Sequence, residues 1–416
     1  MLTKGLTCIA LHVMRVHTTW DKGDRDMEYG WDPDSEAFRA EVRAFCREYA
    51  TEELRAEMRG GGEGDGGREG PLTRRIHEQI ERRGWLRQAW PVEYGGGGKS
   101  PWYQFIMVQE FSYAGIPYGG LSIGSIAPAL MRFGTEEQKR KYLPGIMDGE
   151  ITFAIGYSEP NAGTDLAALQ TRAVRDGDEW VINGQKIWTS QAQVSTHLWL
   201  AARTDPDAPK HRGISMFILP LGLAGISIRP LYTMSGLRTN EVFFEDVRVP
   251  ADGLVGEENR GWYTVANALD HERVSLGPIG ALAHQFDRMV EYLKESRPEQ
   301  LRQDATRQRL ADLKVDLHIL RALNLVNAAI IANHETPTME ASMIKVWSSE
   351  LRYRLSSTNM DLLGRYGALT GENGDLAPNG GTNELTYRSS PVLRFGGGTN
   401  EVQRNIISQR GLGLPR

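Results

Sequence analysis

Hydrophobic positions change their spacing twice along this chain of 416 residues. The first part has the spacing of amphipathic helices, in which one apolar face recurs with each turn. Asp32 followed by Pro33 predicts a helix start with Asp32 as the N-cap. The apolar face of this helix comprises Phe38, Val42, Phe45 and Tyr49. Further helices are predicted over 72–83, over 104–111, and over a segment that Thr135 and Gln138 open as a capping box and Pro144 ends.

Apolar and polar residues alternate from Ile151 onward, as they do in half-buried strands. Candidate strands cover 152–157, 171–175, 179–182, 197–202, 214–219, 226–228 and 241–247. The pairs Asp176-Gly177 and Asn183-Gly184 are typical of hairpin turns. This part of the chain is therefore predicted to form a β domain, either a small barrel or a sandwich.

Helical spacing returns at Gly261. Predicted helices cover 262–283 with a kink at Gly277-Pro278, then 286–294, 310–330 and 339–363. The predicted fold class is α+β, with an N-terminal α-helical domain over 30–150, a middle β domain over 151–258 and a C-terminal α-helical bundle over 259–416. Residues 1–29 are expected to be a disordered extension, with Met27 as an alternative start.

The composition is that of a soluble globular protein, with 40% hydrophobic and 24% charged residues. A net charge of −5 offers no basic field for nucleic acid. Cys8 and Cys46 make neither a disulfide framework nor a metal cluster, and they fit a reducing compartment. No apolar run approaches the roughly 18 residues of a membrane span. We therefore expect a cytoplasmic protein without a bound metal.

Two motifs in the β domain carry candidate chemistry. Residues 155–165 read IGYSEPNAGTD, a strand followed by a turn in which Pro160 fixes its own φ and Gly163 permits close approach of a ligand. Residues 183–190 read NGQKIWTS and bring a tryptophan and two hydroxyls to the end of a strand. A large flat ring needs such an aromatic face and such short donors. An ordinary hairpin with a core tryptophan would show the same pattern.

The combined string resembles the acyl-CoA dehydrogenase family, and the likeness extends with gaps from about Trp31 to Arg416. The resemblance implies the acyl-CoA dehydrogenase-like fold, in which FAD and substrate lie between the β domain and the last bundle. In that family the counterpart of YSEPNAGTD lies along the flavin and the thioester, and the counterpart of KIWTS holds the ring near its N5. The cofactor-binding residues that the resemblance implies are Tyr157, Ser158, Thr164, Trp188, Thr189, Ser190, Gly397, Gly398, Thr399 and Glu401.

Desaturation of an acyl thioester needs a base for the Cα proton and an acceptor for the hydride from Cβ, and no side chain accepts hydride. By resemblance, the commoner position of the base falls on Gly397 and is empty. The second position, used by isovaleryl-CoA and long-chain members, falls on Glu272 in the stretch LDHER. We therefore expect Glu272 to be the base, and Asp270, Arg273 and Thr164 to contact the acyl-CoA substrate. A surface glutamate on a helix is the alternative for Glu272.

One expected segment is missing. Most homotetrameric members carry an Arg-x-x-Phe-Gly segment that contacts the flavin of a neighbouring subunit, and this place reads SRPEQ over 296–300. Arg297 is a candidate to replace the arginine, but the phenylalanine is absent. The chain therefore looks most like bacterial members that pair two different subunits and act on bulky substrates such as steroid side-chain thioesters. We expect a homo- or hetero-oligomer, a dimer or a tetramer, with a partner that supplies the missing half of the flavin site.

The leading hypothesis is an FAD-dependent acyl-CoA dehydrogenase that passes hydride to flavin N5 and electrons to an electron-transfer flavoprotein. An oxidase that passes the electrons to oxygen is a close variant, and residues alone do not separate the two. A non-catalytic or half-site partner subunit and a CoA-thioester-binding protein without redox chemistry are alternatives from other classes. The intact YSEP and KIWTS motifs and Glu272 favour the enzyme.

Overall fold

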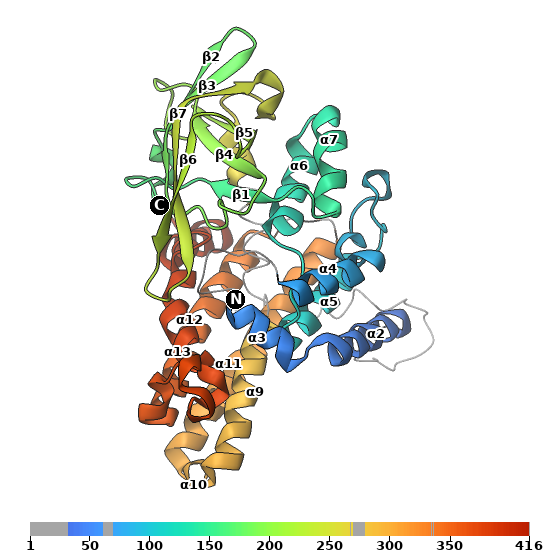
Figure 1. The fold of residues 1–416 in the computed structure, drawn as a ribbon, viewed down its shortest axis with the longest axis vertical. Helices are drawn as coiled ribbons and strands as arrows, with labels where there is room; N and C mark the ends of the chain where they lie inside the picture. The colour runs from blue at the N-terminus through green and yellow to red at the C-terminus, as the bar shows by residue number, and fades with distance from the viewer. Residues whose placement is uncertain are drawn as a thin grey trace. The chain divides into compact units, whose positions relative to one another are not determined.

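The computed structural model describes residues 32–60, 70–266, 268, 279–333, 335 and 337–415. Helices come first, a sheet follows and helices close the chain, so the predicted order of elements is confirmed (Figure 1). The chain divides into two compact units. One comprises Met1–Thr51, Gly98–Pro117 and Leu276–Arg416, and the other comprises Glu52–Gly97 and Tyr118–Ser275. The helices predicted as one N-terminal domain are thus shared between the two units, and the three-domain division stays a prediction.

The first unit is a helical bundle around α9 (Ile279–Ser296), α11 (Asp304–Ala332) and α12 (Met339–Leu363), which lie side by side (Figure 1). Helix α5 (Pro101–Ala114) packs against α9 and also against α2 (Pro33–Tyr49). The bundle core contains the leucines that share one predicted face of α11: Leu310, Leu313, Leu317 and Leu320. Shorter helices complete the unit: α10 (Pro298–Leu301), α13 (Thr382–Ser389) and α14 (Asn400–Ile406).

The start of α2 follows directly from its sequence. The main-chain nitrogen of Ser35 donates to Asp32 Oδ1 at 2.9 Å, so Asp32 is the N-cap that the sequence predicts. Phe38, Val42 and Phe45 are buried on the opposite side of the helix from its charged residues. The predicted kink at Gly277-Pro278 lies outside the described residues.

The second unit contains α3 (Glu52–Gly60), α4 (Pro71–Arg82), α6 (Ala127–Phe133) and α7 (Glu136–Met147). Thr135 and Gln138 form the predicted capping box at the start of α7. The prediction that Pro144 ends this helix is wrong, because α7 continues to Met147. Its last turn buries Leu143 and Ile146, and burial of these side chains outweighs the hydrogen bond that a proline cannot donate.

The sheet of the second unit has eight strands in the order β6-β7-β3-β2-β4-β5-β8, and β1 pairs with β4 in parallel. The strands are β1 (Phe153–Gly156), β2 (Arg172–Asp176), β3 (Glu179–Lys186), β4 (His197–Arg203), β5 (Ile214–Pro220), β6 (Ile226–Tyr232), β7 (Arg238–Pro250) and β8 (Leu254–Val255). Every predicted strand is present. The short β8 escaped prediction because two residues show no alternation.

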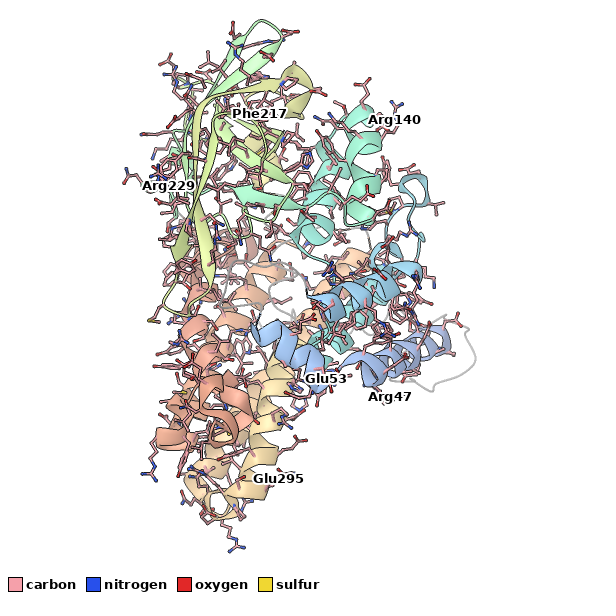
Figure 2. The ribbon with its side chains drawn as sticks, viewed as in Figure 1. Arg47, Glu53, Arg140, Phe217, Arg229 and Glu295 are labelled. Carbon is pink, nitrogen blue, oxygen red and sulfur yellow. The ribbon has the colours of Figure 1, made fainter. Side chains whose placement is uncertain are left out.

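The sheet curls so that one part of it packs over another. The rings of Trp180 on β3 and Phe217 on β5 lie 5.3 Å apart in one buried cluster, although these strands are not neighbours in the sheet. The only register pair between β2 and β4 among the described residues joins Arg172 and Arg203. Figure 2 labels the buried Phe217 among the strands and the exposed Arg229 on the outer strand β6. This curled sheet agrees with the predicted barrel or sandwich.

The turn predicted at Asn183-Gly184 is wrong. Strand β3 continues through both residues, and its register against β7 shifts between Ile182 and Gly184, which is a β-bulge. Gly184 has φ +146°, and a Cβ there would lie 2.7 Å from the Cα of Thr171. The glycine is therefore needed for close contact between two segments and not for chain reversal.

One described helix, α11, is long and apolar enough to cross a membrane by length and composition alone. A single helix of this kind is weak evidence for a membrane span, because core helices of soluble proteins pass the same test. Leu317 and Leu320 in this apolar part of α11 belong to the bundle core.

Candidate functional site

The two sequence motifs of the second unit lie side by side. The Lys186 ammonium donates to the Tyr157 carbonyl at 3.0 Å and to Glu159 Oε1 at 2.8 Å. One residue further on, the main-chain nitrogen of Ile187 donates to the Ser158 carbonyl at 2.9 Å. Strand β1 pairs with β4, whereas β3 pairs with β2 and β7. Lys186 therefore joins segments that sheet pairing alone leaves apart.

The Lys186–Glu159 pair is an ion pair inside the protein, with side-chain exposures of 0% and 9%. Burial lowers the pKa of Lys186 to about 8, although the Glu159 carboxylate favours the charged ammonium. Burial alone would raise the pKa of Glu159, but the Lys186 charge and main-chain donors outweigh it, so this pKa is lowered. Those donors are the nitrogens of Gln170 at 2.6 Å and Thr171 at 2.8 Å. Both ends of the loop between Glu159 and Thr171 are thereby fixed.

Arg203 holds the same loop from within. Its guanidinium donates to the carbonyls of Ala167 at 2.6 Å, Leu169 at 3.2 Å and Lys210 at 2.7 Å. Thr164 lies on this loop and is exposed, so its hydroxyl is available to a ligand.

The turn after β3 is strained. Trp188 and Gln191 have φ of +63° and +62°, a conformation that costs a side chain-bearing residue about 1–2 kcal/mol. The Trp188 indole is nevertheless 57% exposed. The Thr189 hydroxyl is fully buried and has no hydrogen-bond partner among the described residues, while Ser190 is exposed. Backbone strain of this kind is found most often at active sites and ligand-binding sites.

This turn suits a flat aromatic cofactor with a polar edge. An exposed indole offers a stacking surface, and the two following hydroxyls offer short donors at its side. Tyr157 differs in kind, because its side chain is 6% exposed in the core and its hydroxyl accepts from Trp199 Nε1 at 3.0 Å. Only main-chain atoms of Tyr157 and Ser158 are engaged with the second motif in the bonds described above.

The first unit contains the remaining cofactor-binding residues that the sequence predicts. Gly397 and Gly398 have φ of +67° and +92°, which favours glycine, and Thr399 Oγ1 caps α14 by accepting from the Val402 nitrogen at 3.3 Å. Glu401 follows on the exposed side of α14, and its pKa is lowered by hydrogen bonds from its own main-chain nitrogen and from Thr399. Gly397, Gly398 and Thr399 thus form a glycine-rich loop, and Glu401 lies in the first turn of the helix that follows it.

Sequence reasoning missed the residues that support both groups. Lys345 on α12 is 1% exposed and donates to the Arg394 carbonyl at 3.1 Å and to Asn400 Oδ1 at 2.8 Å. These acceptors flank the glycine-rich loop. Lys186 and Lys345 could have been found from the sequence, because each is a lysine at a position where the strand or helix periodicity predicts a buried apolar residue. The periodicity gives no such indication for Arg203.

Asp270, Glu272 and Arg273 lie outside the described residues. Their predicted roles as substrate contacts and base stay predictions.

Comparisons with known proteins agree along the whole chain. Family models of the acyl-CoA dehydrogenase N-terminal, middle and C-terminal domains match residues 32–150, 154–247 and 259–412. The acyl-CoA dehydrogenase FadE26 of Mycobacterium tuberculosis is 41% identical over 406 residues, covering 94% of this chain and 99% of that protein. Members of this family are FAD flavoproteins.

Solved structures show the same relationship. A chain of the Tcur3481-Tcur3483 steroid ACAD has a TM-score of 0.84 and 39% identity, covering 93% of this chain and 99% of that chain. A chain of the ChsE4-ChsE5 complex from Mycobacterium tuberculosis has a TM-score of 0.82 and 40% identity, covering 94% of this chain and 100% of that chain. The chain belongs to the acyl-CoA dehydrogenase family and is an oxidoreductase that acts on acyl-CoA.

Proposed function

We propose that this chain binds FAD and desaturates an acyl-CoA thioester between Cα and Cβ, with Glu272 as the base and an electron-transfer flavoprotein as the electron acceptor. The observation that carries the FAD assignment is the strained turn with its exposed Trp188 and its unpartnered Thr189 hydroxyl. When bound, FAD supplies the hydride acceptor that side chains lack.

Two groups of residues contact the cofactor in this proposal. Trp188, Thr189 and Ser190 of the second unit hold the ring system by stacking and by hydroxyl contacts. Gly397, Gly398, Thr399 and Glu401 are cofactor contacts by resemblance, and the positive φ of the two glycines leaves that main chain open to close approach by a ligand. Lys186 holds the segment with Trp188, Thr189 and Ser190 against the segment that carries Thr164. In this proposal it therefore fixes the position of the flavin ring relative to the thioester.

Glu272 takes the Cα proton in this proposal. Gly397, which stands at the commoner position of the base, has no side chain to do so. A carboxylate enclosed beside an acyl chain has a raised pKa, which suits a general base. Asp270, Arg273 and Thr164 then hold the CoA and pantetheine parts of the substrate.

The substrate class that we propose is a bulky acyl-CoA such as a steroid side-chain thioester. The similar Tcur3481-Tcur3483 protein is a steroid ACAD by its title. In this chain, a Cβ added at Gly120 or Gly124 would meet nothing within 4 Å. Gly124 lies in a π-helical turn, Ser122–Ile126, and such turns occur often at functional sites. Ala127 and Ala129 behind it are fully buried and serve packing.

We further propose that a different, homologous subunit completes the flavin site. The Arg-x-x-Phe-Gly segment is absent, and Arg297 donates to the Leu362 carbonyl at 3.4 Å beside the Tyr366 ring. Arg365 lies on the same ring, with its guanidinium carbon 5.1 Å from the ring centre. The two arginines thus place positive charge beside Tyr366, and Arg297 stands where other members have the absent segment in sequence.

Anaerobic addition of acyl-CoA to the purified flavoprotein tests the reaction. We expect loss of the oxidised flavin band with steroid side-chain CoA, and slower loss with short linear CoA. Glu272→Gln should hold flavin and keep the band, whereas the exposed control Glu257→Gln should bleach like the parent. Bleaching of Glu272→Gln at the parent rate would show that another group is the base.

The electron acceptor needs a separate measurement. The reduced protein should be reoxidised quickly by an electron-transfer flavoprotein and slowly by air. Rapid reoxidation by air alone would identify an oxidase.

A further inference from the structure

The strained turn between Trp188 and Gln191 needs an explanation for its persistence. Two residues with side chains adopt positive φ within four positions, so the turn would relax unless neighbouring structure holds it. The hydrogen bonds of Thr189, which lies inside this turn, show what holds it.

Asn240 on β7 clamps Thr189 from both sides. The Thr189 nitrogen donates to the Asn240 carbonyl at 3.0 Å, and Asn240 Nδ2 donates back to the Thr189 carbonyl at 2.9 Å. The second proton of the same amide goes to Gln193 Oε1 at 2.7 Å. The side-chain amide of Asn240, which is 0% exposed, therefore ties Thr189 inside the turn to Gln193 just beyond it, and the main chain of Asn240 adds a third bond.

We infer that Asn240 is a positioning residue for the flavin, acting through the turn that presents Trp188, Thr189 and Ser190. This inference rests on the proposed function. A side-chain amide is suited to the role because it supplies two donors at a fixed angle, one for the Thr189 carbonyl inside the turn and one for Gln193 beyond it. Leucine has a similar size and supplies neither donor, so a substitution removes both side-chain bonds without opening a large cavity and leaves the main-chain bond to Thr189 in place.

The chain contains a matched control. Asn183 also uses its amide to hold a residue of positive φ, because Asn183 Nδ2 donates to Asp246 Oδ1 at 3.0 Å and the Asp246 nitrogen donates to Asn183 Oδ1 at 2.9 Å. Asp246 has φ +48°. Asn183 and Asp246 are exposed, and neither is among the residues that we assign to the flavin, since Asn183 begins the NGQKIWTS stretch and lies outside its KIWTS part. Asn183→Leu therefore removes equivalent chemistry from the same unit without touching the turn.

The test compares Asn240→Leu with Asn183→Leu in the holoenzyme, purified with any partner that full flavin occupancy requires. We expect FAD to leave Asn240→Leu about tenfold faster, as for the loss of one or two hydrogen bonds. We also expect a shifted visible flavin band and faster amide exchange over 187–192. Asn183→Leu should match the parent in all three measurements. Asn240→Asp, which keeps the size but loses both donors, serves if Asn240→Leu does not fold.

The outcomes separate this inference from the proposed function. Equal FAD release and equal flavin spectra in Asn240→Leu and Asn183→Leu would overturn the role of Asn240, while bleaching of the parent by acyl-CoA would still support the reaction. Unchanged amide exchange over 187–192 would overturn it as well. A parent that holds no flavin under any condition would overturn the proposed function and this inference with it.

Discussion

Lys186 shows how much one side chain can determine at the residue scale. Its ammonium is fully buried and joins two segments through a carbonyl and a carboxylate. Desolvation of both charges makes such a pair a weak source of stability in itself, but loss of one partner leaves the other charge buried alone. The pair therefore specifies the arrangement of the two motifs more than it stabilises the unit.

Lys186→Met should destabilise the protein by about 3–5 kcal/mol, because Glu159 is left charged and unpaired. The double variant Lys186→Met/Glu159→Gln should recover part of this loss, since it removes the buried charge, and the single amide oxygen still accepts from one of the two main-chain nitrogens of Gln170 and Thr171. Denaturant unfolding of the three proteins at neutral pH measures both effects. Equal stabilities of the single and double variants would contradict the role of the ion pair.

The pH dependence of stability follows from the pKa of Lys186. It is about 8 in the folded protein and 10.5 as the ordinary value, so between these values the unfolded chain binds the proton more tightly. This group therefore makes the free energy of unfolding rise with pH in that window. We expect unfolding measurements from pH 8 to pH 10 to show a more positive slope for the parent than for Lys186→Met. Parallel slopes would mean that Lys186 keeps its ordinary pKa.

At the scale of elements, helix α12 contacts two segments of the same sequence. Residues 380–384 and residues 397–401 both read GGTNE. In both copies consecutive glycines have positive φ and a buried asparagine bonds to α12, Asn383 through Asn359 and Asn400 through Lys345. A Cβ at Gly381 would lie 2.3 Å from the Gly371 nitrogen, so the first copy serves packing.

Lys345→Met should loosen the glycine-rich loop that carries Gly397 and Gly398. The Arg394 carbonyl would lose the Lys345 ammonium, at a cost of about 1–3 kcal/mol for an unsatisfied group, whereas Asn400 Oδ1 would lose one donor and keep the Ser349 hydroxyl at 3.1 Å. Hydrogen exchange should increase over 394–400 and stay unchanged along α11. Lys314→Met is the control, since among the described residues that half-exposed lysine makes a long ion pair of 3.8 Å to Asp287 and a contact with the Phe286 ring. Equal exchange in both variants would argue against Lys345 as the support.

Elements were easier to predict from sequence than the contacts between them. The helix at 339–363 and every strand longer than two residues followed from apolar periodicity, because burial of one face imposes it. The predictions of a helix end at Pro144 and of a turn at Asn183-Gly184 were wrong because both rest on local sequence. The helix continues because Leu143 and Ile146 pack in the core, and the strand continues because it pairs with β7, and neither of these contacts is local. The bonds of Asn240 to Thr189 join residues far apart in sequence, and no periodicity records them.

At the scale of the whole molecule, the family follows from all three parts of the chain, and a partner is proposed from what the chain lacks. The titles of two similar structures name two proteins each, Tcur3481-Tcur3483 and ChsE4-ChsE5. A chain without the Arg-x-x-Phe-Gly segment has fewer contacts for a flavin shared between subunits. The missing contacts are the basis for expecting a heteromeric assembly.

We expect the chain purified alone to hold less than one FAD per subunit, and co-expression with a neighbouring homologous gene to restore occupancy and turnover. Absorbance at the flavin band per mole of protein, with mass measurement of the complex, tests this. Arg365→Gln should lower occupancy in the complex, whereas Arg229→Gln on the outer strand β6 should not. Full occupancy and turnover of the chain alone would refute the heteromer.

The exposed indole of Trp188 has a consequence for the newly synthesised protein before FAD binds. On the function proposed above, a newly made chain without its cofactor exposes this aromatic side chain to solvent, and exposed apolar surface favours aggregation. Cells starved of riboflavin should therefore accumulate this protein in insoluble aggregates, or degrade it faster, compared with cells supplied with riboflavin.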